Sequence, residues 1–143
     1  NEPTNTFVAG FIGSPAMNLL EVEYYDGMLV SDEGFSVTLP QGISKQLTDK
    51  GYEDKKIVFG IRPEDLHLDP IAMETYVGGK FTTQVEISEL LGADVMLYTK
   101  IGNSEIVVRG KGSDYVAPGT AIQVAANLSK AHYFDAVTTN RII

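Results

Sequence analysis

The chain has 143 residues, of which 43% are hydrophobic and 21% are charged, a composition typical of a folded globular protein and not of a disordered tail. Its 11 basic and 19 acidic residues give a formal net charge of −8, which argues against nucleic acid as a partner because such binding depends on Lys and Arg at the phosphates. It has no Cys, which excludes a disulfide framework and a thiolate nucleophile, and no apolar run approaches the roughly 20 residues that span a bilayer. We therefore expect a soluble domain without membrane insertion.

The first predicted element is a short helix near the N-terminus, in the sequence FVAGFIGSPAMN. Phe7, Phe11 and Ile12 fall on one stripe at helical spacing, and the Gly-Ser-Pro sequence that follows ends the helix. Two helical turns are too short to be stable alone, so this stripe packs on another surface, either the domain's own core or a neighbouring domain. Because the sequence begins at Asn1 and not at Met, we expect a longer protein.

Alternating apolar residues then predict a β-meander. The strand from Leu20 to Tyr24 leads into Asp26-Gly27, a strong hairpin signal, and Met28 to Val30 forms the returning strand. The third strand of the meander carries its buried face on Phe35, Val37 and Leu39.

A short exposed helix follows, because Ile43 and Leu47 lie at helical spacing before Gly51. The continuous apolar run from Ile57 to Ile61 predicts a strand buried on both faces, which Pro63 ends.

The second half of the chain repeats the strand pattern. Two alternating segments predict one buried face on Phe81, Thr83, Val85 and Ile87, and another on Val95, Leu97, Thr99 and Ile101. Further strands are predicted over Glu105 to Arg109, Ala121 to Ala125 and His132 to Phe134. Short strands with little helix indicate a mainly β protein, a small barrel or sandwich.

The sequence gives no catalytic signature. A phosphate-binding P-loop is absent, and its nearest fragments, Gly78-Gly79-Lys80 and Gly110-Lys111-Gly112, fit β-turns better. There is no nucleophile-elbow motif either, and His132 in an apolar strand fits a packed imidazole. We predict that this chain is not an enzyme.

The acidic cluster RPEDLHLD offers a metal site as an alternative. Alternation places Asp65, His67 and Asp69 on one side of an extended segment, where they could ligate a metal. We favour a solvated strand edge, since carboxylates commonly follow Pro in turns, and we expect no metal.

Several blocks, in order, carry a resemblance to one family: FVAGFIGSPAMN, GIRPEDL, ELLGAD, PGT and KAHYFD. Together they resemble the C-terminal regulatory domain of the maltose-type ATP-binding subunits of carbohydrate ABC importers. The resemblance implies an OB-like small barrel with a second small β subdomain built from discontinuous pieces, and one or two short helices. It makes residues 1–143 one regulatory domain, with 1–18 as a junction helix to an ATPase domain that is absent from this chain and would hold ATP and Mg²⁺.

The family's function is not catalytic. The resemblance implies that two regulatory domains hold their subunits together through the transport cycle, at the cytoplasmic face of the cell membrane. The implied partners are a second copy of the subunit, the membrane permease subunits through the ATPase domain, and, in some members, a phosphotransferase-type regulator.

Individual residues carry over from the family motifs. The junction with the ATPase domain is expected at Phe7, Phe11 and Ile12. The residues expected to shape a strand and turn are Gly60, Arg62, Pro63 and Glu64. The partner-facing candidates are Glu89, Gly92 and Phe134, although Glu89 could simply be exposed, Gly92 could serve only a positive φ angle and Phe134 could lie in the core.

Two alternative functions and one departure from the family pattern remain. A freestanding module that binds an oxyanion such as molybdate is less attractive in an acidic chain, and an oligonucleotide-binding barrel ranks last for the same reason. Relatives often carry Gly in the turn where this chain has Asn140, which tolerates the left-handed conformation.

Overall fold

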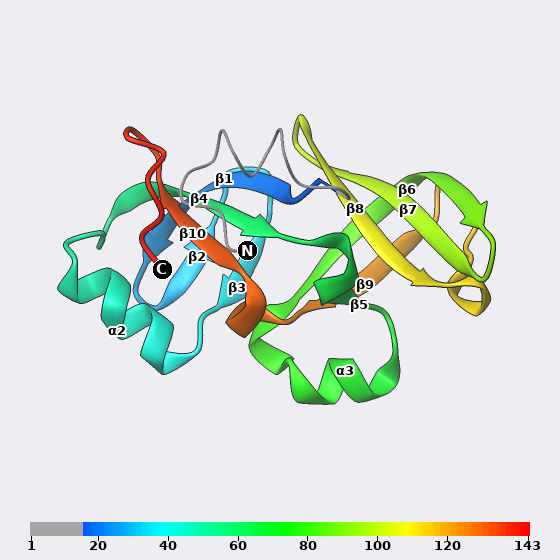
Figure 1. The fold of residues 1–143 in the computed structure, drawn as a ribbon, viewed down its shortest axis with the longest axis horizontal. Helices are drawn as coiled ribbons and strands as arrows, with labels where there is room; N and C mark the ends of the chain where they lie inside the picture. The colour runs from blue at the N-terminus through cyan, green and yellow to red at the C-terminus, as the bar shows by residue number, and fades with distance from the viewer. Residues whose placement is uncertain (1–15) are drawn as a thin grey trace.

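The described part of the chain, residues 16–143 of a computed structural model, forms two antiparallel sheets side by side along the long axis (Figure 1). The first sheet has the strand order β10-β4-β1-β2-β3 and the second the order β5-β9-β6-β7-β8. The strands of the first sheet are β1 Asn18–Tyr25, β2 Met28–Val30, β3 Ser36–Thr38, β4 Lys55–Ile61 and β10 His132–Asp135. Those of the second are β5 Leu66–His67, β6 Lys80–Leu91, β7 Asp94–Ile101, β8 Ser104–Lys111 and β9 Ala121–Ala126. The expected mainly β fold is confirmed.

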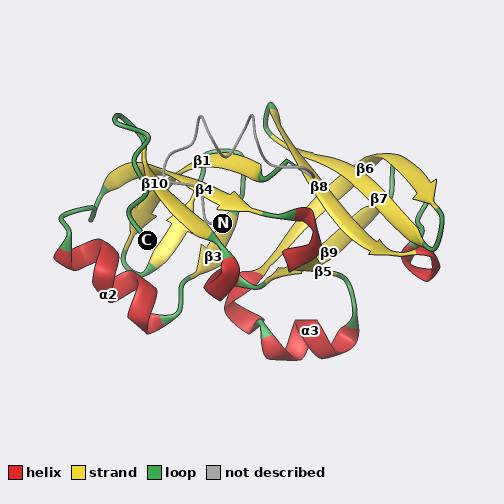
Figure 2. Ribbon diagram, viewed as in Figure 1, coloured by secondary structure: helices red, strands yellow, loops and turns green. Residues whose placement is uncertain are grey.

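The two labelled α-helices lie along the lower side of the molecule in the view of Figure 2. Within residues 16–143 the α-helices are α2 Gln41–Asp49 and α3 Pro70–Thr75. The 3₁₀ segments are η1 Pro63–Asp65, η2 Val77–Gly79, η3 Gly112–Asp114 and η4 Leu128–Lys130. The helix expected around Leu47 is thus confirmed, whereas α3 was not expected.

Asp69 is the N-cap residue of helix α3. The Asp69 carboxylate accepts a hydrogen bond from the Ala72 amide at 3.0 Å, and Pro70 occupies the first helical position. An acidic cap followed by Pro is a helix-start signal, and it lies inside the cluster that we interpreted as a strand edge.

The chain crosses between the sheets twice. It leaves the first sheet after β4, builds the whole second sheet and returns to the first sheet as β10, which pairs with β4. The first sheet is therefore the one assembled from discontinuous pieces, whereas the second sheet, for which the resemblance implied them, comes from the continuous segment β5 to β9.

One hydrophobic core extends through both sheets. The Phe35 ring, just before β3, lies 5.2 Å from Phe81 on β6 and 6.0 Å from Phe59 on β4, and Phe59 lies 5.9 Å from Tyr133 on β10. Edge-to-face and tilted rings at these separations pack favourably. This row of aromatic residues joins the two sheets, so both sheets share the main core.

A single amide side chain also joins the sheets. Asn18, at the start of β1, donates a hydrogen bond to the carbonyl of Val107 on β8 and accepts one from the Val107 amide, both at 2.8 Å. Asn18 is buried, with 6% of its surface exposed. Its side chain thus satisfies backbone groups on β8 that would otherwise lack a strand partner.

The glycines expected to form β-turns have other positions. Gly78 and Gly79 lie in η2, and a Cβ at Gly79 would collide with the carbonyl oxygen of Ala126. Gly110 lies inside β8, and Gly112 opens η3. The close approach of two backbones at Gly79, not a turn, explains this glycine.

The turn near the C-terminus forms without glycine. Its left-handed residue is Thr139, with φ of 63°, and not Asn140. The Asp135 carboxylate holds the turn by accepting hydrogen bonds from the amides of Val137 and Thr138, both at 2.8 Å, and from the Tyr52 hydroxyl at 2.7 Å.

Among residues 16–143, no helix is long and apolar enough to cross a membrane.

Candidate interface on the β6–β7 hairpin

The β6–β7 hairpin forms the far end of the second sheet and carries two of the three partner-facing candidates (Figure 1). Strand β6 starts with its apolar residues inward, and Phe81, Thr83 and Val85 are buried as expected. A β-bulge between Val85 and Ile87 then shifts the register. The extra residue reverses the alternation, so Ile87 faces outward, and our placement of Ile87 on the buried face was wrong.

Large apolar side chains are exposed beyond this bulge. Ile87, Leu90 and Leu91 have 58%, 59% and 51% of their surfaces exposed, and we call these three residues the hairpin patch. Ile87 and Leu91 share one face of the strand and Leu90 lies on the other, because successive side chains alternate. A partner that buries all three must therefore enclose both faces of the hairpin end. Exposed apolar residues gathered at one place indicate an interaction surface, whereas single ones do not.

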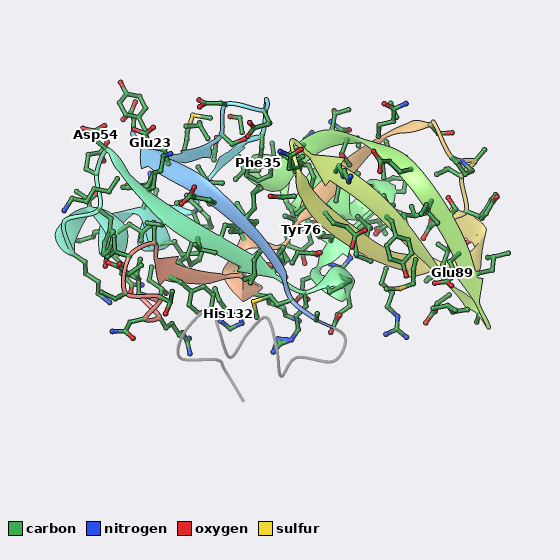
Figure 3. All side chains as sticks on the ribbon, turned by 90° about the horizontal axis from the view of Figure 1, so that it is seen from above. Glu23, Phe35, Asp54, Tyr76, Glu89 and His132 are labelled. Atoms are coloured by element: carbon green, nitrogen blue, oxygen red, sulfur yellow. The ribbon has the colours of Figure 1, made fainter. Side chains whose placement is uncertain are left out.

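Glu89 lies within this patch. It is exposed, and its carboxylate accepts a hydrogen bond from the Tyr98 hydroxyl at 3.0 Å across the hairpin. This hydrogen bond raises the pKa of Tyr98 above its usual value. Figure 3 shows Glu89 at the end of the second sheet, far from Phe35 and Tyr76 near the middle of the molecule.

Gly92 forms the tip of the hairpin. Its φ is 62°, a conformation that glycine adopts at little cost at the first central position of a two-residue turn. A Cβ at this position would meet nothing within 4 Å, so the tip is open to solvent. The turn geometry accounts for Gly92, and its exposure leaves the tip accessible to a partner.

Phe134, the third partner-facing candidate, is fully buried in β10. It packs with Met17, Leu19 and Val58 in a small cluster. The side chain is therefore not available to a partner, and the alternative that Phe134 belongs to the core is correct.

The GIRPE residues lie at the end of β4 and in η1. A Cβ at Gly60 would lie 2.5 Å from the Met17 sulfur and 3.1 Å from the Phe134 ring, so glycine makes room for that cluster. Pro63 is buried and begins η1, and the Arg62 carbonyl accepts the Asp65 amide at 3.0 Å. Glu64 is exposed.

The predicted junction residues Phe7, Phe11 and Ile12 lie outside the described residues, as does most of the predicted 1–18 helix. Asn18, the last residue of that range, already belongs to β1.

The alternative metal site does not assemble in the described part of the chain. Asp69 caps α3, and the His67 ring stacks on Tyr76 with centroids 5.6 Å apart. Within residues 16–143 no group of three or more His, Asp or Glu side chains converges in a way that could hold a metal.

A groove of about 640 Å³ lies between α3 and the segment that follows η3. Its wall includes Leu68, Met73, Tyr115 and Ile122, and its acidic groups are Glu74 and Asp114. None of the residues described around it is basic, so the groove is unsuited to an oxyanion.

Sequence reasoning missed the hairpin patch because it assumed unbroken alternation along β6. The signal that could have found it is the sequence EISELL itself, since three large apolar residues within five positions cannot all face one side of a strand.

Two family models match the chain. The MalK OB fold domain matches residues 13–66, and the TOBE domain matches residues 59–134, which is more than half of the chain.

The chain is also similar to curated ATP-binding proteins of transporters. It is 44% identical over 138 residues to the multiple sugar-binding transport ATP-binding protein MsmK of Streptococcus mutans, covering 96% of this chain and 37% of that protein. It is 39% identical over 140 residues to the oligosaccharides import ATP-binding protein MsmX of Bacillus subtilis, covering 98% of this chain and 38% of that protein. The chain thus spans less than two fifths of these relatives' length.

A solved structure shares the fold. The cytoplasmic molybdate-binding protein ModG, with molybdate bound, superposes with a TM-score of 0.60 over 81% of this chain and 94% of that one, at 12% sequence identity. At such low identity the likeness concerns the fold alone. The family matches and the curated relatives go further: this chain belongs to the TOBE domain family, and it is an OB/TOBE domain of the kind that ATP-binding subunits of sugar ABC importers carry.

Proposed function

We propose that this chain is the regulatory and dimerisation domain of a carbohydrate importer's ATP-binding subunit, and that two copies meet through the hairpin patch. The observation that carries the proposal is the exposure of Ile87, Leu90 and Leu91 around Glu89 at the end of the second sheet. The names of the relatives supply the transport context.

In this proposal the domain itself catalyses nothing. ATP and Mg²⁺ bind to an ATPase domain of the whole subunit, and that domain contacts the membrane permease subunits. The whole subunit works in the cytoplasm, at the inner face of the cell membrane. A phosphotransferase-type regulator is a further partner that we propose for the whole subunit.

The size of the patch supports weak self-association. A half-exposed Leu or Ile that becomes buried gains about 1 kcal/mol, so three such side chains from each of two copies contribute about 6 kcal/mol. Association costs about 4–15 kcal/mol in lost freedom of motion. The patch alone therefore barely offsets this cost, and the isolated chain should associate weakly, with the ATPase domains adding the rest.

Sedimentation equilibrium at high protein concentration tests the proposal. We expect a concentration-dependent rise in mass that Leu90→Asp and Leu91→Asp abolish, because each variant would bury a charge at the interface. The matched control is Val137→Asp, which alters a side chain that is 91% exposed in the C-terminal turn and should leave the association unchanged. A mass that stays at 15.5 kDa for the unmodified chain, or an equal loss in the control, would contradict the proposal.

A further inference from the structure

Three of the chain's 11 Lys and Arg residues gather around one pocket of about 410 Å³, in a protein with a net charge of −8. The pocket lies where η1, η4, the start of β10 and the C-terminal residues meet. Its charged lining is Arg62, Lys130 and Arg141 with Asp65, and His132 forms part of the wall. Among the described residues, the side chains of the lining thus carry three positive charges against one negative charge, before any contribution from His132.

Two of these cations, Arg62 and Lys130, form no ion pair within the described part of the chain. Within residues 16–143, neither Arg62 nor Lys130 has a carboxylate within 4.0 Å, whereas Arg109 and Lys45 do. Arg62 is half-buried, which limits the number of positions that its guanidinium can adopt. An unpaired guanidinium beside an ammonium is a favourable setting for the oxygens of an anion.

Asp65, the acidic side chain among the described lining residues, does not neutralise the pocket. Burial raises the pKa of Asp65, against the opposing influence of Lys130, so this carboxylate is itself held in a partly desolvated wall. Its backbone is fixed as well, because its amide bonds to the Arg62 carbonyl at 3.0 Å and its carbonyl accepts the Asn127 amide at 3.0 Å. These hydrogen bonds hold η1 next to Asn127, the residue before η4, so Arg62 and Lys130 stay on the same pocket wall.

We propose that this pocket binds a tetrahedral oxyanion, the phosphate group of a small molecule or inorganic phosphate. The volume lies within the range of small-ligand sites and is too small for a folded partner. The pocket is also separate from the hairpin patch, since its lining residue His132 belongs to the first sheet and Glu89 lies at the end of the second (Figure 3). The site therefore adds a ligand to the domain without involving the proposed dimer surface.

The test is an amide-resolved NMR titration of the 143-residue chain at constant ionic strength, with inorganic phosphate in one series and glycerol 3-phosphate in the other. We expect saturable shifts at residues 129–132 and at Arg62. Arg62→Gln and Lys130→Gln should each weaken the binding about tenfold, because each removes one charge-assisted contact. Arg109→Gln and Lys45→Gln make the same changes at sites that are already paired, and should leave the affinity unchanged.

The two series identify the source of the anion. Tighter binding of glycerol 3-phosphate assigns the site to an organic phosphate, and tighter binding of inorganic phosphate assigns it to the free ion. Shifts that do not saturate in either series, or that Arg109→Gln and Lys45→Gln weaken as much as the pocket variants do, overturn the proposal. Lys130 is exposed, so Lys130→Gln remains informative even if Arg62→Gln disturbs the end of β4.

Discussion

Asn18→Ala should destabilise the domain by separating its two sheets at one point. The substitution removes two hydrogen bonds of 2.8 Å and leaves the amide and carbonyl of Val107 without these partners. Each hydrogen bond contributes about 1 kcal/mol, and each unsatisfied buried group costs about 1–3 kcal/mol. Val107 is half-buried, so water can satisfy part of this need. We expect a loss of about 2–3 kcal/mol in the free energy of unfolding.

Urea unfolding of the chain measures this loss. The control is Asn103→Ala, which changes an exposed residue at a hairpin tip and should alter the stability by less than about 0.5 kcal/mol. Asn18→Asp sharpens the test, because a carboxylate cannot donate to the Val107 carbonyl until it is protonated. This variant should thus be destabilised at neutral pH and recover relative to the unmodified chain as the pH falls. Equal stability of Asn18→Ala and Asn103→Ala would refute the reasoning.

Three further predictions concern other local features. Gly79→Ala should cost more than about 2 kcal/mol in thermal or urea unfolding, because its Cβ would collide with backbone at Ala126 and not with a movable side chain; a change below about 0.5 kcal/mol would contradict the close approach. Thr139→Gly should leave the domain equally stable or up to about 1 kcal/mol more stable. A β-branched residue at φ of 63° is strained, and relief of that strain exceeds the entropy that glycine adds to the unfolded chain. A clear loss of stability on urea unfolding would show that Thr139 is not strained. The amide hydrogen bonds from Thr138, together with Tyr52 and Val137, lower the pKa of Asp135 to about 2. A lowered pKa in the folded state means that Asp135 stabilises the fold above its unfolded pKa of about 3.9, and that this contribution is lost as the pH falls toward 2. The stability of Asp135→Asn should therefore decline less between about pH 4 and 2 than that of the unmodified chain, and identical acid profiles would exclude this role.

Most strands could be predicted from the sequence, because apolar and polar residues alternate along a strand that has one face against the core. The turn at Asp26-Gly27 formed as expected, since both residues adopt positive φ angles, and the buried face on Val95, Leu97, Thr99 and Ile101 is confirmed. These features depend on neighbours in the sequence and on which face of the strand meets the core.

The errors have non-local causes. The bulge in β6 moved Ile87 to the surface, and whether a strand bulges depends on its partner β7 and not on its own pattern. Gly79 was interpreted as a turn residue because the carbonyl that it faces, at Ala126, is distant in sequence. The burial of Phe134 likewise depends on Met17, at the other end of the chain.

The candidate site was predictable only in part. The motif drew attention to Glu89 and Gly92, and both lie on the hairpin that carries the exposed apolar residues. The pocket beside Arg62 could not be predicted, because Lys130 and Arg141 are brought to it by the return of the chain into the first sheet.

The most direct test of the central claim is a distance measurement between two copies. The chain has no native Cys, so one nitroxide label can be placed by Ala93→Cys at the hairpin tip, or in a separate sample by Val137→Cys in the C-terminal turn. If two copies meet through the hairpin patch, pulsed dipolar spectroscopy will give a defined inter-copy distance for Ala93→Cys that is shorter than that for Val137→Cys. A self-associated sample with no dipolar coupling at position 93, or with the shorter distance at position 137, would show that the copies meet elsewhere.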